Sequence, residues 1–123
     1  SLTCCVSFVQ EAVVEALNGP QGSVADMVDE FRARRELVMR CLAEIPTLNC
    51  NTPHGAFYLF PTFDHKMSSV DMAAYLLEEA HVAVTPGSVF GPSGEGRIRI
   101  SYACSRKDIV DGMSRIKDAL AKL

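Results

Sequence analysis

The feature that most constrains the fold of this chain is a loop rich in glycine and proline that leads directly into a strand. The loop, residues 85–96, holds four glycines and two prolines. At that density these residues direct the backbone rather than fill a core, because glycine permits unusual φ values and proline removes a donor. The strand, residues 97–102, has a two-residue period that separates two faces. The polar face carries Arg97, Arg99 and Ser101, and the apolar face carries Ile98, Ile100 and Tyr102.

Arg99 is the unusual residue of the polar face, because it lies in the middle of the strand. A guanidinium in that place usually needs a carboxylate partner. The commonest arrangement is a surface ion pair on a solvated strand face, which contributes little to stability. The alternative is a functional role for Arg99. The strand pattern alone leaves both interpretations open.

Length, composition and charge narrow the class of protein. With 123 residues, 48% hydrophobic and 22% charged, the chain suits one globular domain. Its net charge of −3 argues against a nucleic-acid partner. No apolar run approaches the roughly 20 residues of a membrane span, and no signal peptide opens the chain, so no membrane partner is expected. The chain starts at Ser1 without an initiator methionine, which suggests a fragment or a processed product.

The five cysteines show neither a metal-site pattern nor a disulfide framework. They are Cys4, Cys5, Cys41, Cys50 and Cys104. No C-x-x-C occurs and no histidine lies at ligand spacing, so a zinc site is not expected. An odd count suits a reducing compartment, where free cysteine behaves as a small apolar residue. We therefore expect structural cysteines, no metal and a cytoplasmic location.

Four helices are predicted from capping boxes and apolar stripes. The boxes begin at Ser7, Ser23, Ser68 and Ser105. Asn18-Gly19-Pro20 ends the first helix and Pro46 ends the second, which has the longest stripe with a period close to 3.6 residues. The opposite face of the second helix, which includes Arg34 and Arg35, is most simply a solvated face with i,i+4 ion pairs.

Three strands are predicted, at residues 56–60, 82–84 and 97–102. A polar linker, Thr47 to His54, precedes the first. The connection between the first two strands should be a right-handed crossover that leaves them parallel. The third strand would then pair antiparallel, and one arrangement places it between them. The sequence therefore predicts an α+β fold, a small mixed or antiparallel three-stranded sheet covered by helices, in a single domain spanning residues 1–123.

Several motifs, read in order, resemble one enzyme family. They are Gly55-Ala56-Phe57-Tyr58, Val84-Thr85-Pro86-Gly87, Phe90-Gly91, Gly94-Glu95-Gly96 and the strand from Arg97 to Ala103. Pro53 and the opening stretch from Thr3 to Gln10 also resemble their counterparts. Together these motifs resemble the C-terminal part of a class I pyridoxal-phosphate aminotransferase of fold type I, close to the aspartate aminotransferase group. The resemblance covers nearly the whole chain.

The resemblance implies a role for Arg99. This residue lines up with the family's strand arginine, which binds the α-carboxylate of the amino-acid substrate, whereas Arg97 falls on a variable position. A planar guanidinium on a rigid strand can bind a carboxylate through two parallel hydrogen bonds. Phe90 resembles a residue that lines the substrate pocket, although core packing would explain it as well. Gly55 is expected to serve backbone geometry rather than ligand contact.

The resemblance also implies pyridoxal 5'-phosphate in the full-length enzyme, held in a large domain by a Schiff-base lysine, an acid and phosphate contacts. None of these can be placed in this chain. The loop from Gly91 to Gly96 leads into a strand and not a helix N-terminus, so it is weak evidence for a phosphate site. The three histidines are assigned no role. The family's Ser-x-x-Lys context surrounds none of the lysines, which are Lys66, Lys107, Lys117 and Lys122.

We therefore predict the small C-terminal domain of a pyridoxal-phosphate-dependent transaminase of the aspartate/2-oxoglutarate type, with no catalytic residue and no bound cofactor in this fragment. Its substrates would be amino acids and 2-oxo acids. The intact enzyme would be a homodimer in which this domain moves to close the active site and residues 1–7 approach it. The alternatives are a free-standing, non-catalytic module that binds small amino acids, or a related fold type I enzyme such as a carbon–sulfur lyase or an aminocyclopropane-carboxylate synthase relative.

Overall fold

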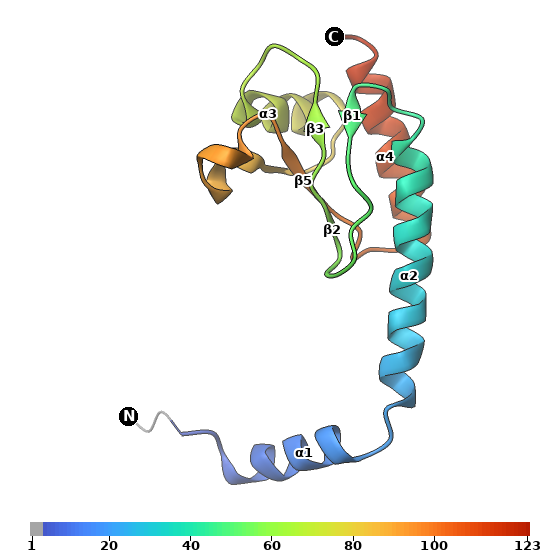
Figure 1. Ribbon diagram of the computed structural model, residues 1–123, viewed down its shortest axis with the longest axis vertical. Coiled ribbons are helices and arrows are strands. Elements are labelled where there is room, and N and C mark those ends of the chain that lie inside the picture. Colours follow the sequence, from blue (N-terminus) through green and yellow to red (C-terminus); the bar gives the residue numbers. More distant parts are fainter. Residues whose placement is uncertain (1–3) are drawn as a thin grey trace. The chain divides into compact units, whose positions relative to one another are not determined.

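The computed structural model describes residues 4–123 (Figure 1). These residues divide into two compact units, one ending at Glu30 and the other running from Phe31 to Leu123. The prediction that residues 1–7 approach an active site falls partly on Ser1, Leu2 and Thr3, which lie outside the described residues. Within residues 4–123, every helix is too short or too polar to cross a bilayer.

The first unit contains helix α1 (Ser7–Asn18) and the start of helix α2 (Gly22–Leu42). The predicted helices are confirmed, but their predicted caps are wrong. The residue before α1 is Val6, which offers no side-chain cap, and the Gln10 amide instead donates to the Cys5 carbonyl at 2.8 Å. Ser23 lies inside α2, because that helix starts one residue earlier.

The second unit carries the remaining elements. In order they are the rest of α2, strands β1 (Leu48–Asn49), β2 (Tyr58–Leu59) and β3 (Thr62–Phe63), helix α3 (Ser69–Glu79), strand β4 (Thr85–Pro86), the 3-10 turns η1 (Gly87–Phe90) and η2 (Pro92–Gly94), strand β5 (Ile98–Ser101) and helix α4 (Arg106–Leu120). Ser68 caps α3 and Ser105 caps α4 as predicted, since each hydroxyl accepts the amide three residues on at 3.1 Å.

The central sheet has the order β2-β5-β4, and β5 pairs antiparallel with both neighbours. Thr85 lies opposite Arg99, and Tyr58 lies opposite Ser101. Strands β2 and β4 therefore run in the same direction, as predicted, and β5 lies between them, an order that the sequence left open. A second antiparallel pair joins β1 to β3.

Two predicted strands are displaced. Residues 82–84 are not a strand, because His81 has a positive φ of 54° and the Val82 amide donates back to the Leu76 carbonyl, so this segment still completes the end of α3. Strand β2 starts only at Tyr58, since Ala56 has a φ of 57°, outside the extended region. Strand β1 lies in the segment predicted to be a polar linker.

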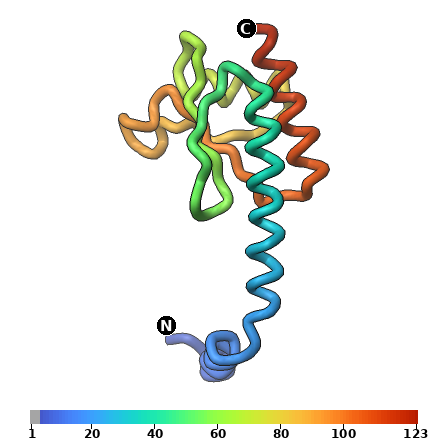
Figure 2. Tube along the Cα trace, turned by 45° about the vertical axis from the view of Figure 1, so that its right-hand side comes forward, coloured from blue at the N-terminus to red at the C-terminus, as the bar shows by residue number. Residues whose placement is uncertain are grey.

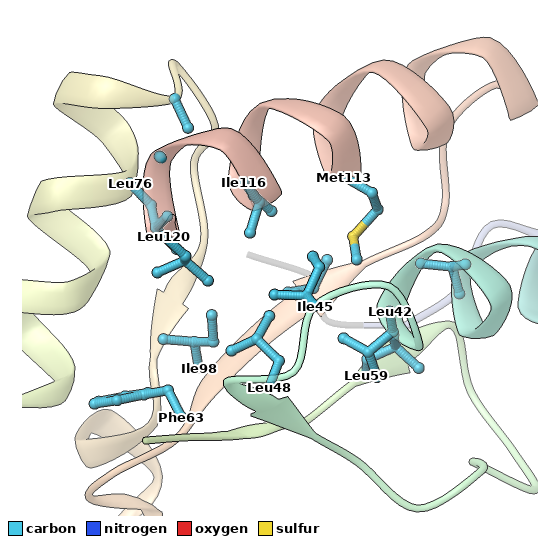
Figure 3. Close-up of a cluster of buried hydrophobic side chains, with 14 of the residues drawn as sticks. Leu42, Ile45, Leu48, Leu59, Phe63, Leu76, Ile98, Met113, Ile116 and Leu120 are labelled. Atoms are coloured by element: carbon cyan, nitrogen blue, oxygen red, sulfur yellow. The ribbon is translucent and has the colours of Figure 1, made fainter. Parts of the chain in front are cut away.

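The core lies between the sheet and the helices of the second unit. Figure 3 shows apolar side chains from all of these layers converging: Leu42, Ile45, Leu48, Leu59, Phe63, Leu76, Ile98, Met113, Ile116 and Leu120. Helix α4 runs beside the C-terminal part of α2 in two views (Figures 1 and 2), and the Lys117–Glu44 ion pair links α4 to the turn after α2. The predicted α+β class, with helices over small antiparallel sheets, is confirmed.

Strand β5 shows the two faces that its sequence predicts. Ile98, Ile100 and Tyr102 are buried, with Ile98 completely inaccessible to solvent. The Tyr102 hydroxyl donates to the Ala56 carbonyl at 3.1 Å, which satisfies its polar tip. Burial of the apolar face fixes the strand's orientation, so the polar face with Arg99 must point away from the core.

Candidate functional site

Arg99 lies between two aromatic rings on the polar face of β5. Its guanidinium carbon is 4.4 Å from the centre of the Tyr58 ring and 5.0 Å from that of Phe90. Both distances are within the range of cation–π attraction. Its Nη2 also donates to Thr85 Oγ1 at 3.2 Å. The neighbouring strands β2 and β4 and the turn η1 therefore each supply one contact.

The contacts of Arg99 include no carboxylate. Among residues 4–123, Arg99 takes part in no ion pair, whereas other basic residues do pair with acids, for example Arg115 with Asp111 and Lys117 with Glu44. The guanidinium has five N–H donors, and one of them is committed to Thr85. Arg99 is only half-buried, so its remaining donors can reach a carboxylate from outside the chain.

Tyr58, Phe60, Phe90 and Arg99 line an open pocket of about 230 Å³, which we call the Arg99 pocket. The Phe60 and Phe90 rings meet edge to face, with centroids 5.7 Å apart. Phe90 is 53% exposed, so it forms part of this pocket and not of the core. One cation on a wall of aromatic rings suits a small molecule with a carboxylate at one end, since apolar surroundings strengthen a charge-assisted hydrogen bond.

Arg97 lies on the same strand face but in different surroundings. Its guanidinium carbon lies 5.7 Å from the centre of the Phe60 ring, and its Nη1 donates to the Phe60 carbonyl at 3.4 Å. It does not line the Arg99 pocket. Two arginines two residues apart therefore meet different neighbours.

The loop that carries Phe90 is tied to helix α3 by Glu95. Its Oε1 accepts hydrogen bonds from the Ser69 amide at 2.6 Å and from the Ser69 hydroxyl at 3.0 Å. The Ser69 hydroxyl in turn accepts from the Gly96 amide at 3.0 Å. The Ser69 amide bond first, and then its hydroxyl bond, lower the pKa of the Glu95 carboxyl. Because Ser69 is the first residue of α3, the helix end also favours this negative charge.

The glycines of the loop set its path, as the sequence predicts. Gly87 and Gly94 approach backbone to backbone, so that a Cβ on Gly94 would overlap the Gly87 carbonyl oxygen. Gly91 has a φ of 109°, which suits glycine. The prediction for Gly55 is wrong: it has no positive φ and nothing lies within 4 Å of a Cβ placed there, because the positive φ belongs to Ala56.

The described residues do not fit pyridoxal phosphate by themselves. All four lysines are exposed, and two of them pair with glutamates. The loop amides that could bind a phosphate are used internally: Gly91 donates to Ser88, Gly94 to Gly91 and Glu95 to Pro92. Within residues 4–123, no group of three or more histidine, cysteine or acidic side chains could hold a metal ion.

The sequence could indicate Arg99, but it could not indicate two features around it. In the sequence, Tyr58 stands out only as part of a motif, and its contact with Arg99 depends on the register of β2 against β5. Glu95 likewise stands out only as part of a motif, and its partner Ser69 lies 26 residues earlier in the chain.

Comparison with known proteins gives one consistent family. The aminotransferase class I and II family matches residues 1–116. An aspartate aminotransferase from Pyrococcus horikoshii is 43% identical over 117 residues, which cover 93% of this chain and 30% of that protein. An aspartate aminotransferase from Rhizobium meliloti is 41% identical over 132 residues, covering 98% of this chain and 32% of that protein.

Solved structures agree with these relatives. The aromatic aminotransferase from Pyrococcus horikoshii superposes with a TM-score of 0.93 at 40% identity, covering 98% of this chain and 33% of that one. The aspartate aminotransferase from Rhizobium meliloti gives a TM-score of 0.89 at 40% identity, covering all of this chain and 33% of that one. The chain therefore spans about a third of the length of the relatives it matches.

Proposed function

This chain belongs to the class I and II aminotransferase family, and from that premise we propose that residues 1–123 are the small C-terminal domain of a pyridoxal-phosphate-dependent transaminase. We place it with the aspartate/2-oxoglutarate enzymes, because relatives at 43% and 41% identity are aspartate aminotransferases. In this proposal the rest of the longer protein holds the cofactor, and Arg99 binds the α-carboxylate of the substrate.

The observation that carries the proposal is the state of Arg99. Its guanidinium is supported by two aromatic rings and a hydroxyl, takes part in no ion pair among residues 4–123, and lines an open pocket. A surface ion pair would require a carboxylate from this chain, and the described residues place none there. An incoming carboxylate can instead accept two parallel hydrogen bonds from the guanidinium.

The role of this chain in the reaction is to orient the substrate. The cofactor, when bound by the remainder of the protein, supplies the electron sink that makes the substrate's Cα–H acidic. Arg99 fixes the α-carboxylate, which limits rotation about the bond between Cα and the substrate nitrogen and presents the Cα–H in one direction. The aromatic walls of the Arg99 pocket give this contact apolar surroundings, which strengthen a charge-assisted hydrogen bond. Movement of the domain would bring Arg99 to the substrate and close the site.

The partners belong to the same proposal. The substrates are amino acids and 2-oxo acids, and the enzyme is a homodimer whose contacts come mainly from the part of the protein outside this chain. The cytoplasmic location stays a prediction from the cysteine pattern.

The test uses the longer protein that contains this chain, with Arg97 as a matched control on the same strand face. Arg99→Lys keeps the positive charge but loses the planar pair of N–H donors of the guanidinium, so one hydrogen bond to the carboxylate disappears. Such bonds contribute about 1.5–3 kcal/mol, so kcat/KM should fall by about ten- to a hundredfold. Arg99→Ala should lower kcat/KM further, and Arg97→Ala should lower it much less. A larger loss in Arg97→Ala than in Arg99→Ala, with cofactor still bound, would overturn the assignment.

A further inference from the structure

The guanidinium of Arg99 lies over two aromatic rings, and one of its five N–H donors is committed to Thr85. The N–H donors of a guanidinium lie in its plane, whereas aromatic rings attract the cation through their own faces. Tyr58 and Phe90 contact Arg99 through their rings, and among residues 4–123 neither side chain accepts a hydrogen bond from it through an oxygen atom. Within the described part of the chain, Thr85 alone accepts a hydrogen bond from the Arg99 guanidinium.

We propose that Tyr58 is a positioning residue, whose ring holds the Arg99 guanidinium in the orientation that receives the substrate carboxylate. The inference rests on the proposed function of Arg99. An arginine side chain has many rotamers, and a bound carboxylate must otherwise order them. A ring that selects the productive orientation in advance reduces that cost, which raises affinity for the acid group specifically.

Tyr58 suits this role better than Phe90 does. Its ring centre is closer to the guanidinium, at 4.4 Å against 5.0 Å. It comes from β2, which pairs with β5 in fixed register, whereas Phe90 is the exposed last residue of a 3-10 turn. The Phe57 ring packs against Tyr58 at 4.6 Å between centroids and limits its movement.

The ring of Tyr58, and not its hydroxyl, makes this contact. Among the hydrogen bonds of residues 4–123, none involves the Tyr58 hydroxyl, whereas those of Tyr75 and Tyr102 donate to backbone carbonyls. Removal of the hydroxyl should therefore leave Arg99 in place. This gives the experiment a matched pair of variants, Tyr58→Phe with the ring and Tyr58→Leu without it.

The experiment measures how strongly the cofactor-loaded longer protein prefers an amino acid over its α-carboxamide, as a ratio of kcat/KM values. This ratio reports on the carboxylate contact, because a general structural defect would impair both substrates alike. We expect Tyr58→Leu to reduce the ratio about five- to tenfold, mainly through a higher KM for the acid. Tyr58→Phe should retain the original ratio. If Tyr58→Leu does not fold, Tyr58→Met replaces it in the experiment, because it also lacks the aromatic ring.

A double-mutant cycle separates this inference from the proposed function. In an Arg99→Ala background, Tyr58→Leu should leave the ratio unchanged, because no guanidinium remains to be held. If Arg99→Ala lowers the ratio but Tyr58→Leu does not, Arg99 binds the carboxylate and the inference about Tyr58 is wrong. The inference would also be refuted if Tyr58→Leu lowered the ratio equally with Arg99 present and with Arg99 replaced by alanine. A loss of the ratio in Tyr58→Phe as large as that in Tyr58→Leu would refute it too. If Arg99→Ala leaves the ratio unchanged, the proposed function itself fails.

Discussion

The Glu95 carboxylate accepts both the backbone amide and the hydroxyl of Ser69, and so joins the loop before β5 to the first residue of helix α3. Ser69 is completely buried, so its donors have no access to water and depend on this carboxylate. The two ends of the loop are fixed by different means, since Gly87 packs against Gly94 while Glu95 is tied to α3. Phe90 lies between these two points, which links the shape of the Arg99 pocket to residues that do not line it.

The first prediction concerns pH. Hydrogen bonds from Ser69 lower the pKa of Glu95 in the folded chain, whereas the unfolded chain keeps the ordinary value of about 4.3. A group with a lowered folded pKa stabilises the fold above its unfolded pKa, and this contribution is lost as pH falls through the folded pKa. Glu95→Gln should therefore lower Tm near neutral pH, and the gap between wild type and variant should narrow below about pH 4. A gap that widens on acidification would contradict the assigned shift.

The second prediction concerns the contact between Gly87 and Gly94. Gly94→Ala places a methyl group against the Gly87 carbonyl, and such overpacking typically costs about 1–3 kcal/mol. Gly55→Ala is the matched control, since nothing lies within 4 Å of its added Cβ and its φ is not positive. Denaturant unfolding should show a clearly lower free energy of unfolding for Gly94→Ala and almost no change for Gly55→Ala. Equal losses would mean that the loop relaxes around the new methyl group.

Local chemistry made part of this fold predictable. The caps at Ser68 and Ser105 depend on residues three positions away, and the two faces of β5 follow from its alternating side chains. Both signals lie within a few residues of the element they define. The caps predicted at Ser7 and Ser23 are wrong because the helices begin elsewhere, one after Val6 and one at Gly22.

What the sequence could not show depends on distant residues or on backbone angles without a clear residue signal. Ala56 and His81 adopt positive φ although neither is glycine, and these two angles displaced both strand predictions. The pairing of Tyr58 with Arg99 requires the register of β2 against β5, which only the folded sheet defines. The strand pattern draws attention to Arg99 and the family resemblance implies its role, so the binding of a carboxylate by this residue stays a prediction.

The third prediction concerns the first unit, taken as part of the isolated chain. No residue of α1 is buried, and Phe8 and Leu17 are 72% and 75% exposed. Apolar side chains left in water favour association. We expect weak self-association of the isolated chain in sedimentation experiments, reduced in a Phe8→Glu, Leu17→Glu double variant. Tight dimers at nanomolar concentration would argue against this explanation.

The last prediction is that the isolated chain neither binds pyridoxal phosphate specifically nor transaminates. Lys66 and Lys107 are exposed, while Lys117 and Lys122 pair with glutamates at 2.8 and 3.6 Å. A lysine that reacts with an aldehyde must be neutral, and the carboxylate beside Lys117 disfavours loss of that lysine's proton. The Glu44 carboxylate, first through its hydrogen bond and then through its charge, in fact raises the pKa of Lys117.

The measurement is the visible absorbance of a lysine-bound cofactor after the chain and pyridoxal phosphate are mixed and excess cofactor is removed. We expect weak reaction spread over several lysines, and no amino transfer from aspartate to 2-oxoglutarate. Lys117→Arg keeps the positive charge beside Glu44 and removes the amine, so it tests the lysine with the most distinct surroundings. Stoichiometric absorbance abolished by substitution of any single lysine would show that this chain carries a cofactor site of its own.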